Sequence, residues 1–223
     1  KKWEGDADIK KYWKQRHTLF ARYDQGIQLD RESWYSVTPE ALALHHAARC
    51  SGGTVLDAFC GAGGNAIALA RAGSHVIAID IDPEKIRLAR HNARVYQVEE
   101  KIEFIQGDFL ALAPGFRSKA DAVFLSPPWG GPSYTSFEVF DLRQMTVDGP
   151  AVLLAALAIC DKVAAFLPRN TNLAQVAAVL SEHHLRIGGG ACRVEMEKNL
   201  VNSQLKALTV YFGPLAANNP GRG

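Results

Sequence analysis

The chain has 223 residues, of which 48% are hydrophobic and 22% charged, and its formal net charge is only +2. This length and apolar content suit one large α/β domain with room for a small appendage, and no apolar run approaches the roughly 20 residues needed to cross a bilayer. The four cysteines are scattered and the histidines lack metal-ligand spacing, which favours free thiols in a reducing compartment over disulfides or a metal. No signal peptide is visible and the chain does not begin with Met, so we expect an excised domain.

Residues 1–36 form a polar segment outside the strand pattern, which we predict to be a helical extension. Within it, the stretch from Lys10 to Arg22 contains five Lys or Arg and no acidic residue, and aromatic residues such as Tyr12 and Trp13 lie between its cations. Positive charge beside aromatic rings suits the phosphates and bases of RNA, but an amphipathic helix with a solvated basic face has the same composition. Both interpretations are open at this point.

After this segment, apolar runs typical of strands alternate with helical patterns. Thr38 and Pro39 suit the cap and the first position of a helix that continues to about Arg49. Strands are predicted near residues 54–60, 75–81, 101–106, 120–126, 163–168, 191–199 and 207–213, and helices near 64–72, 83–97, 149–160 and 171–184. This alternation predicts a mostly parallel, doubly wound α/β sheet.

A glycine-rich turn follows the first predicted strand, in the run TVLDAFCGAGGN over residues 54–65. Gly61 and Gly63 allow the backbone to approach a ligand closely and to take positive φ. The next strand ends in Asp80, about twenty positions further on, where dinucleotide folds place the acidic residue that binds ribose hydroxyls. S-adenosylmethionine carries the same ribose, and the Gly-x-Gly-x-x-Gly spacing of a pyrophosphate site is absent. The motif therefore favours S-adenosylmethionine.

The residues after the second and third strands extend this predicted cofactor site. Ile81 follows Asp80 directly, and Asp108 and Phe109 follow the third strand. Asp108 is suited to accept the adenine amine, and Phe109 to pack on the adenine ring. The alternatives are a helix cap before Pro83 for Asp80 and a turn residue for Asp108.

The fourth predicted strand ends in Ser126-Pro127-Pro128-Trp129. Neither proline can donate to a sheet ladder, so the prolines end the strand and hold the tryptophan at the carboxyl edge of the sheet, where open α/β sheets bind ligands. Enzymes that methylate an exocyclic amine have a short polar residue, two prolines and an aromatic residue here. The prolines fix a carbonyl that accepts from the amine, and the aromatic ring stacks on the base. The alternative is a strand-ending turn beside a core tryptophan.

The last two strands are joined by a short link at residues 201–206, which has no room for a helix and suits an antiparallel hairpin. A mostly parallel seven-stranded sheet with an antiparallel last strand is the pattern of Rossmann-like class I methyltransferases. We therefore predict a methyltransferase domain over residues 37–217, preceded by the helical extension at 1–36. The tail at 218–223 is predicted to be disordered.

Together these motifs resemble the catalytic domain of the trimethylguanosine synthases, which hypermethylate RNA caps. The most discriminating strings are FLSPPWGGP over residues 124–132 and SVTPE over residues 36–40, and the resemblance covers nearly the whole chain. The other matching residues are Tyr12, Trp13, Phe20, Gly26, Ile27, Leu29, Asp30, Arg31, Glu32, Tyr35, Tyr134 and the ranges 57–61, 79–83, 107–109 and 166–170.

The resemblance implies that two methyl groups pass, one at a time, from S-adenosyl-L-methionine to the exocyclic N2 of a 7-methylguanosine cap, leaving S-adenosyl-L-homocysteine and 2,2,7-trimethylguanosine. It implies a catalytic group of Ser126 and Pro127 beside the amine, with Trp129 stacked on the base. It implies a cofactor site that includes Ser36, Thr38, Asp57, Asp80, Asp108 and Phe109. It implies a cap site of Lys11, Trp129, Tyr134, Arg169 and Asn170, in which Lys11, Tyr134 and Arg169 meet the phosphates.

The resemblance also implies binding partners and a cellular location. The expected substrates are capped small nuclear and small nucleolar RNAs, and ribonucleoprotein partners would bind through flanking regions. The expected location is the nucleus, in the nucleolus or nuclear bodies, and the cytoplasm, with no membrane and no metal involved. In this family, the N-terminal extension is a small helical lobe that closes the active site.

Two other functions are compatible with parts of the sequence. The closest is an amino-group methyltransferase that acts on adenine N6 or a glutamine amide, but such enzymes usually have Asn or Asp at the position of Ser126. The other is a methyltransferase fold that binds RNA without catalysis, against which Asp57, Gly61 and Asp80 argue. No residue of the proline–tryptophan motif is an obvious general base, so we expect catalysis by alignment and desolvation.

Overall fold

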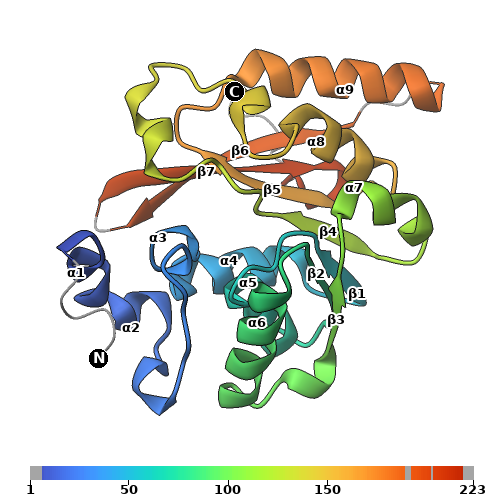
Figure 1. Ribbon diagram of the computed structural model, residues 1–223. Coiled ribbons are helices and arrows are strands. Elements are labelled where there is room, and N and C mark those ends of the chain that lie inside the picture. The colour runs from blue at the N-terminus through green and yellow to red at the C-terminus, as the bar shows by residue number, and fades with distance from the viewer. Residues whose placement is uncertain (1–6, 189–191, 202, 218–223) are drawn as a thin grey trace.

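The computed structural model describes residues 7–188, 192–201 and 203–217 (Figure 1). Its strands are β1 (Thr54–Asp57), β2 (His75–Asp80), β3 (Ile102–Gln106), β4 (Ala122–Leu125), β5 (Val163–Pro168), β6 (Val194–Val201) and β7 (Gln204–Phe212). Its α-helices are α1 (Ala7–Trp13), α2 (Arg16–Leu19), α3 (Ser33–Ser36), α4 (Glu40–Cys50), α5 (Gly64–Arg71), α6 (Pro83–Val95), α7 (Phe109–Leu112), α8 (Gly149–Leu157) and α9 (Leu173–Ile187). The tail at 218–223, predicted to be disordered, lies outside the described residues.

The strands form one sheet in the order β3-β2-β1-β4-β5-β7-β6. Strands β1 to β5 are parallel to one another, whereas β7 is antiparallel to both β5 and β6. The predicted seven-stranded sheet with an antiparallel last strand is therefore confirmed. The chain builds the β1–β3 half first and then returns to place β4 on the other side of β1, so the order reverses between β1 and β4.

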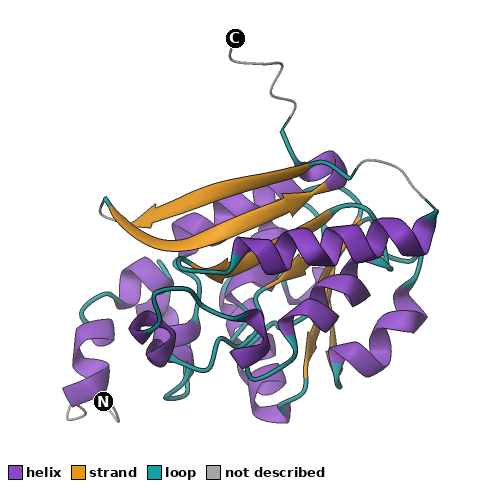
Figure 2. Cartoon of the chain, turned by 90° about the horizontal axis from the view of Figure 1, so that it is seen from above, coloured by secondary structure: helices purple, strands orange, loops and turns teal. Residues whose placement is uncertain are grey.

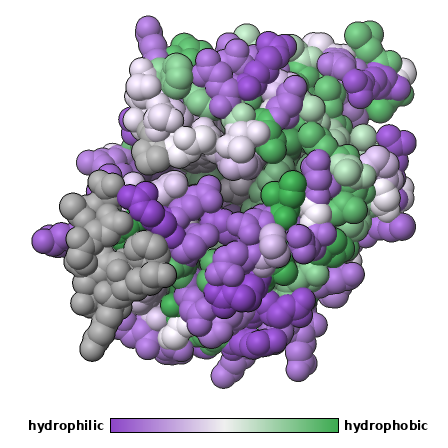
Figure 3. Space-filling model, in the orientation of Figure 1, coloured by the Kyte–Doolittle hydropathy of each residue, from purple (hydrophilic) through white to green (hydrophobic). Residues whose placement is uncertain are grey.

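Two helical layers cover the sheet, because successive side chains of each strand point to opposite faces. Val55, Val76 and Phe124 pack with α4, α5 and α6 on one face. Leu56 and Val123, their sequence neighbours, pack with α7, α8 and α9 on the other. Figure 1 shows α8 and α9 above the sheet and α4, α5 and α6 below it. Figure 3, in the same orientation, shows mainly hydrophilic side chains on the lower part of the molecular surface around α6, as expected for an amphipathic helix.

The sequence misplaced the start of α4. Pro39 occupies the cap position with a ψ of 135°, and the helix begins at Glu40 without a side-chain cap. Thr38 cannot cap it, because Thr38 is buried and its hydroxyl accepts a hydrogen bond from Asn65 Nδ2 at 3.2 Å. The predicted link at residues 201–206 is also shorter than expected, since Leu200 pairs with Leu205 and extends both strands of the hairpin.

The N-terminal extension shares a hydrophobic core with the sheet. Its buried residues Ile9, Leu19, Phe20, Ile27, Leu29 and Trp34 belong to the same cluster as the helices under the sheet. In both cartoon views, α1 and the tip of the β6–β7 hairpin lie on the same side of the molecule (Figure 1, Figure 2). Removing the whole extension would therefore remove core residues, and single substitutions are the better test of its role.

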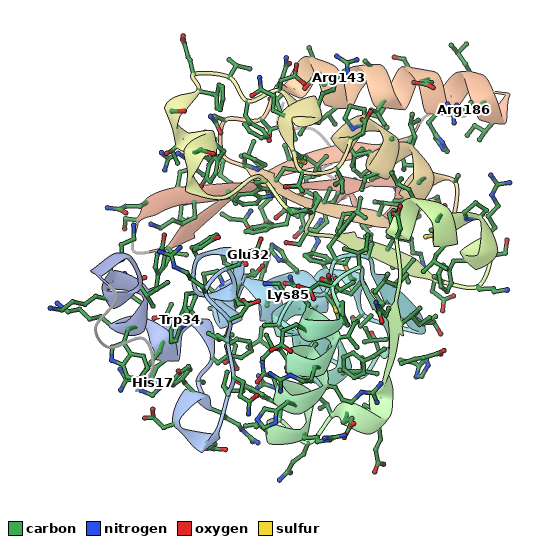
Figure 4. The ribbon with its side chains drawn as sticks, in the orientation of Figure 1. His17, Glu32, Trp34, Lys85, Arg143 and Arg186 are labelled. Atoms are coloured by element: carbon green, nitrogen blue, oxygen red, sulfur yellow. The ribbon has the colours of Figure 1, made fainter. Side chains whose placement is uncertain are left out.

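A buried lysine ties the extension to α6. Lys85 is 6% exposed, and its Nζ lies 2.7 Å from Asp30 Oδ2, 3.1 Å from Glu32 Oε2 and 3.3 Å from Ser33 Oγ. Figure 4 shows Glu32 and Lys85 beside one another between α3 and α6. This ion-pair group fixes the segment that leads into α3.

Replacing Lys85 with alanine should lower the free energy of unfolding by about 1–3 kcal/mol, because it leaves the carboxylate of Asp30 partly buried without its cation. Chemical denaturation measures the change. Arg94→Ala is the matched control on the same helix, since its ion pair with Glu99 does not involve the extension and Arg94 is exposed, so that its loss should change stability little. Equal losses in the two variants would contradict this role for Lys85.

Candidate functional site

The predicted site residues gather where the strand order reverses. The carboxyl ends of β1 and β4 are adjacent there, with Leu56 opposite Val123 and Asp57 opposite Phe124. The glycine turn leaves β1 and the proline–tryptophan turn leaves β4 at this edge. A reversal of strand order opens a crevice at the carboxyl edge of an α/β sheet, and ligands bind in that crevice.

Asp57 ends β1 with an isolated carboxyl group. The residue is 0% exposed, and neither carboxyl oxygen has a partner in good hydrogen-bond geometry. Burial raises the pKa of Asp57 to about 7 and the nearby Asp80 adds to the shift, while the poorly aligned backbone amides of Phe59 and Ala66 lower it only in part. A buried, unpartnered carboxyl group is suited to a cationic ligand group, such as the ammonium of a methionine moiety.

The two predicted glycines have different roles. Gly61 has a φ of +52°, and a Cβ atom there would meet nothing within 4 Å. Gly63 has a φ of +91°, and a Cβ atom there would lie 3.0 Å from Ala89 Cα of α6. Gly61 therefore leaves open space for a ligand, whereas Gly63 lets the start of α5 approach α6 closely.

Asp80 ends β2 and is held by two backbone amides. Its Oδ2 accepts from the Gly61 amide at 2.9 Å, and its Oδ1 accepts from the Asp82 amide at 3.0 Å. The cap of α6 is Asp82, whose Oδ1 accepts from the Glu84 amide at 2.8 Å. Asp80 is therefore not the helix cap of the alternative interpretation. Each of its oxygens retains a lone pair, which suits the two hydroxyls of a ribose.

The three residues that extend the predicted cofactor site, Ile81, Asp108 and Phe109, are placed differently from one another. Ile81 is 68% exposed directly beside Asp80, which suits the face of a planar ring. Asp108 caps α7 by accepting from the Leu110 amide at 2.9 Å, yet the residue is exposed. Phe109 is only 2% exposed and packs against Phe59 with ring centroids 5.6 Å apart. The ring of Phe109 thus fills the core, and packing on adenine would require it to become exposed.

The segment that contains Ser36 and Thr38 reaches the glycine turn through Val37 and Thr38. Ser36 is exposed at the end of α3, and Thr38 receives the hydrogen bond from Asn65 in the first turn of α5. A Cβ atom on Gly64 would lie 3.8 Å from the carbonyl oxygen of Thr38. The structure thus brings the segment before α4 to the predicted cofactor site.

The turn after β4 fixes Trp129 through several contacts. Trp129 is half-buried, its Nε1–H donates to the Phe166 carbonyl at 3.3 Å, and the two rings lie 5.4 Å apart at 39°. Pro127 is buried, and Ser126 is partly exposed. The Pro128 carbonyl accepts from the Thr146 amide at 3.1 Å, which fixes the turn and leaves this oxygen one further lone pair.

Of the predicted cap residues, Tyr134 contacts Trp129, while Arg169 is related to this place through Tyr134 and Lys11 through Tyr12. Tyr134, in the short 3-10 helix η4 (Pro132–Ser136), packs edge to face on Trp129 with centroids 5.2 Å apart and an angle of 84°. Burial raises the pKa of Tyr134, and the charges of Arg169 and Tyr12 also act on it, so both side chains lie near. Lys11 is exposed beside Tyr12, with Nζ 4.8 Å from the ring centroid. The extension, η4 and the end of β5 thus meet at one place.

Asn170, which the resemblance places in the cap site, uses its amide group within the protein. Its Nδ2 donates to the carbonyl oxygens of Tyr134 at 3.0 Å and Phe137 at 2.7 Å, and its Oδ1 is buried. Both amide N–H groups are therefore engaged, and no donor is left for a cap phosphate. Asn170 instead holds the loop that carries Tyr134.

Two residues next to the site were not assigned to it from the sequence. Phe166 supports the indole of Trp129, and Tyr12 lies near Tyr134. Both belong to the strings that carry the family resemblance, but only the folded chain shows what they contact. Among the described residues, no three His, Cys, Asp or Glu side chains are grouped to hold a metal, and no helix is long and apolar enough to cross a membrane.

The raised pKa of Asp57 predicts a pH-dependent stability. In the unfolded chain this carboxyl group ionises near its usual pKa of about 4, whereas in the folded protein it keeps its proton until about pH 7. The folded state thus binds the extra proton in this window, so the free energy of unfolding should fall as the pH rises towards 7 and then level off. Denaturation of the wild type and of Asp57→Asn across this range measures the difference. Parallel curves for the two proteins would contradict the prediction.

The family model described as RNA cap guanine-N2 methyltransferase matches residues 52–215. This range includes both turns at the strand reversal. The chain belongs to the RNA cap guanine-N2 methyltransferases. Like other members of this family, it is an S-adenosylmethionine-dependent enzyme that methylates the exocyclic N2 of the cap guanine, and its substrate is capped RNA.

Curated relatives of this methyltransferase include two fungal proteins. It is 44% identical to the trimethylguanosine synthase of Schizosaccharomyces pombe over 92% of this chain and 85% of that protein. It is 36% identical to the trimethylguanosine synthase of Saccharomyces cerevisiae over 75% of this chain and 56% of that protein. The chain thus spans little more than half of the second relative.

Solved structures share the fold of this methyltransferase. A methyltransferase from Porphyromonas gingivalis superposes with a TM-score of 0.69 and 18% identity, covering 94% of this chain and 50% of that one. An RNA methyltransferase from Pyrococcus horikoshii superposes with a TM-score of 0.56 and 18% identity, covering 90% and 98%. These likenesses show the Rossmann-like fold that the sequence predicted.

Proposed function

We propose that this methyltransferase transfers two methyl groups in succession to N2 of a 7-methylguanosine cap and releases 2,2,7-trimethylguanosine. The observation that carries the proposal is the half-buried indole of Trp129, which follows β4 at the strand reversal. The glycine turn that follows the neighbouring strand β1 is hydrogen-bonded there to Asp80. The names of the two fungal relatives support the second methyl transfer.

The residues at the carboxyl ends of β1 and β2 fit S-adenosylmethionine, which supplies an electrophilic methyl group on a positively charged sulfonium. Asp80 would bind the ribose hydroxyls, and Ile81 would cover one face of the adenine. Asp108 would accept from the adenine amine with the oxygen that does not cap α7. Asp57 would face the ammonium group, whose positive charge favours the ionised carboxylate. Ser36 would close the site from the side of the extension.

The aromatic and basic residues around Trp129 fit a methylated cap. N7-methylguanine is positively charged, and a cation over the face of a tryptophan gains about 0.5–2 kcal/mol. Arg169 can bind phosphate oxygens with two parallel hydrogen bonds, whereas Lys11 supplies a compact charge and Tyr134 a hydroxyl donor. Because Lys11 lies on α1, we also propose that the extension acts as a lid over the cap.

The turn after β4 would align the amine for methyl transfer. Ser126 and Pro127 would lie beside N2, and the buried ring of Pro127 restricts how far the backbone can move. Ser126 at neutral pH is a hydrogen-bonding group rather than a base. We therefore propose that these residues act by orienting the nitrogen and excluding water, and that the proton leaves to solvent after transfer.

The proposed RNA partners are small nuclear and small nucleolar RNAs, and the proposed location is the nucleus, in the nucleolus or nuclear bodies, and the cytoplasm. Both follow from the family resemblance and the named relatives. Ribonucleoprotein partners would bind regions outside this chain.

The experiment that tests the proposal is turnover of purified protein with S-adenosylmethionine and 7-methyl-GTP, with products separated by mass. We expect a monomethylated intermediate followed by 2,2,7-trimethyl-GTP. A single methyl addition would overturn the second step. Methylation of an adenine-containing RNA without a cap, or cap binding without any turnover, would overturn the proposed activity in favour of one of the two other functions.

A further inference from the structure

We propose that Phe137 stacks on the base of the first nucleotide after the cap, so that the enzyme binds both nucleosides of a dinucleotide cap. The inference rests on the proposed function, because it requires the 7-methylguanine base on Trp129. It assigns a second base site to the loop of residues 129–140, called here the aromatic loop.

Four aromatic rings form a continuous row through the aromatic loop. Trp129 and Tyr134 have centroids 5.2 Å apart, Tyr134 and Phe140 are 6.3 Å apart, and Phe140 and Phe137 are 5.9 Å apart. Trp129 is partly exposed at one end of the row, and Phe137 is 42% exposed at the other, while Phe140 between them is 1% exposed. The row therefore presents accessible aromatic surface at both ends, with a buried ring in the middle.

Two of the proposed phosphate-binding residues lie at this row. Tyr134 is its second ring, and Arg169 directly precedes Asn170, whose Nδ2 donates to the carbonyls of Tyr134 at 3.0 Å and Phe137 at 2.7 Å. The charge of Arg169 also acts on Tyr134. A polyphosphate held by Arg169 and Tyr134 would thus have the 7-methylguanosine on one side and Phe137 on the other. The nucleoside attached to the far end of the triphosphate is the group expected there.

The exposure of Phe137 is unusual for a large aromatic residue. Val139, two residues further along the chain, is 58% exposed. Phe140 pairs with Thr171, and Leu173, two residues after Thr171, is 42% exposed. Apolar side chains grouped beside a charged site indicate a binding surface. Unpaired bases of RNA are bound by stacking on aromatic rings, which tolerates any base because every base has a flat face.

The backbone of the aromatic loop is fixed before any ligand binds. Asn170 holds the carbonyls of Tyr134 and Phe137, and the Phe140 amide donates to the Asn170 carbonyl at 2.7 Å. Ser136 Oγ also donates to the Ser133 carbonyl at 2.8 Å. A ring presented on a fixed backbone loses little freedom on binding, so stacking contributes more fully to affinity.

The test compares the affinities of two ligands, 7-methyl-GTP and the dinucleotide cap 7-methylguanosine-triphospho-adenosine, measured by calorimetry. Wild type should bind the dinucleotide cap more tightly. Phe137→Ala should reduce affinity for the dinucleotide cap by about five-fold or more and leave 7-methyl-GTP affinity and turnover unchanged. Phe137→Tyr should retain wild-type affinity. Leu185→Ala is the matched control, because Leu185 is 84% exposed near Arg186 at the far end of α9 (Figure 4).

Each other outcome would overturn the inference in a distinguishable way. Equal wild-type affinity for the two ligands would remove the second base site and leave the proposed function standing. Equal weakening of both ligands by Phe137→Ala would show that the ring only supports the loop. If Phe137→Ala left both affinities unchanged, the ring would not contact the second base and the inference would be wrong. Failure of wild type to bind either 7-methylated ligand would overturn the proposed function itself.

Discussion

Trp129→Ala is expected to abolish methyl transfer to 7-methyl-GTP, and Trp129→Phe to weaken it. The alanine variant loses the aromatic surface that fixes the base next to the proline turn, whereas the smaller phenylalanine ring retains part of it. Wild type should also prefer 7-methyl-GTP over GTP by about 2- to 30-fold, the value that corresponds to a cation on a tryptophan face. Steady-state kinetics with both nucleotides measures the preference.

A loss of activity can be attributed to the base site only if the variants remain folded. Trp129 contacts both hydrophobic clusters, so circular dichroism and a thermal melt should accompany the kinetics. S-adenosylmethionine affinity is the second control, because Trp129 lies outside the proposed cofactor residues. Similar kcat/KM values for GTP and 7-methyl-GTP in the wild type would show that the positive charge on the base is not recognised.

Asp80→Ala is expected to reduce S-adenosylmethionine affinity by about 10- to 100-fold while cap affinity stays nearly intact. The variant removes the carboxylate proposed to bind two ribose hydroxyls, and it also releases the Gly61 amide from its 2.9 Å hydrogen bond. Calorimetry with each ligand separates the two affinities.

Asp82→Ala is the matched control, since Asp82 is the nearby aspartate that caps α6. Loss of a helix cap should lower stability by about 1 kcal/mol without a comparable change in cofactor affinity. If Asp80→Ala bound S-adenosylmethionine as tightly as wild type does, the ribose assignment would be wrong.

The sequence alone located the edge of the sheet where ligands are expected, because the proline and glycine motifs that end the strands act locally. The proline pair ends β4 at a fixed residue, and the glycine turn ends β1, wherever the rest of the chain lies. In parallel strands the carboxyl ends meet at one edge, so Gly61, Asp80 and Trp129 could be placed together before any contact was known. The same reasoning gave the antiparallel last strand from a link that is too short for a helix.

Side-chain accessibility could not be predicted in this way. Phe109 was expected at the ligand and is a core residue, because its ring meets Phe59 from the neighbouring turn. Asn170 was expected in the cap site, and its amide hydrogens are used by two carbonyls of a loop more than 30 residues away in the chain. Thr38 was expected to cap a helix, and its hydroxyl is instead engaged by Asn65 of another helix.

The sequence by itself therefore determined the fold class, the ends of the strands and which functional side chains lie at the carboxyl edge of the sheet. These depend on the hydrophobic periodicity and on the backbone conformations that glycine allows and proline forbids. Only the tertiary structure decided which side chains remain accessible, because burial depends on partners that are distant in the chain. It placed Lys85 in the contact with the extension and Tyr12 near Tyr134. It also left Phe137 exposed at the end of an aromatic row, a position that no local pattern in the sequence indicates.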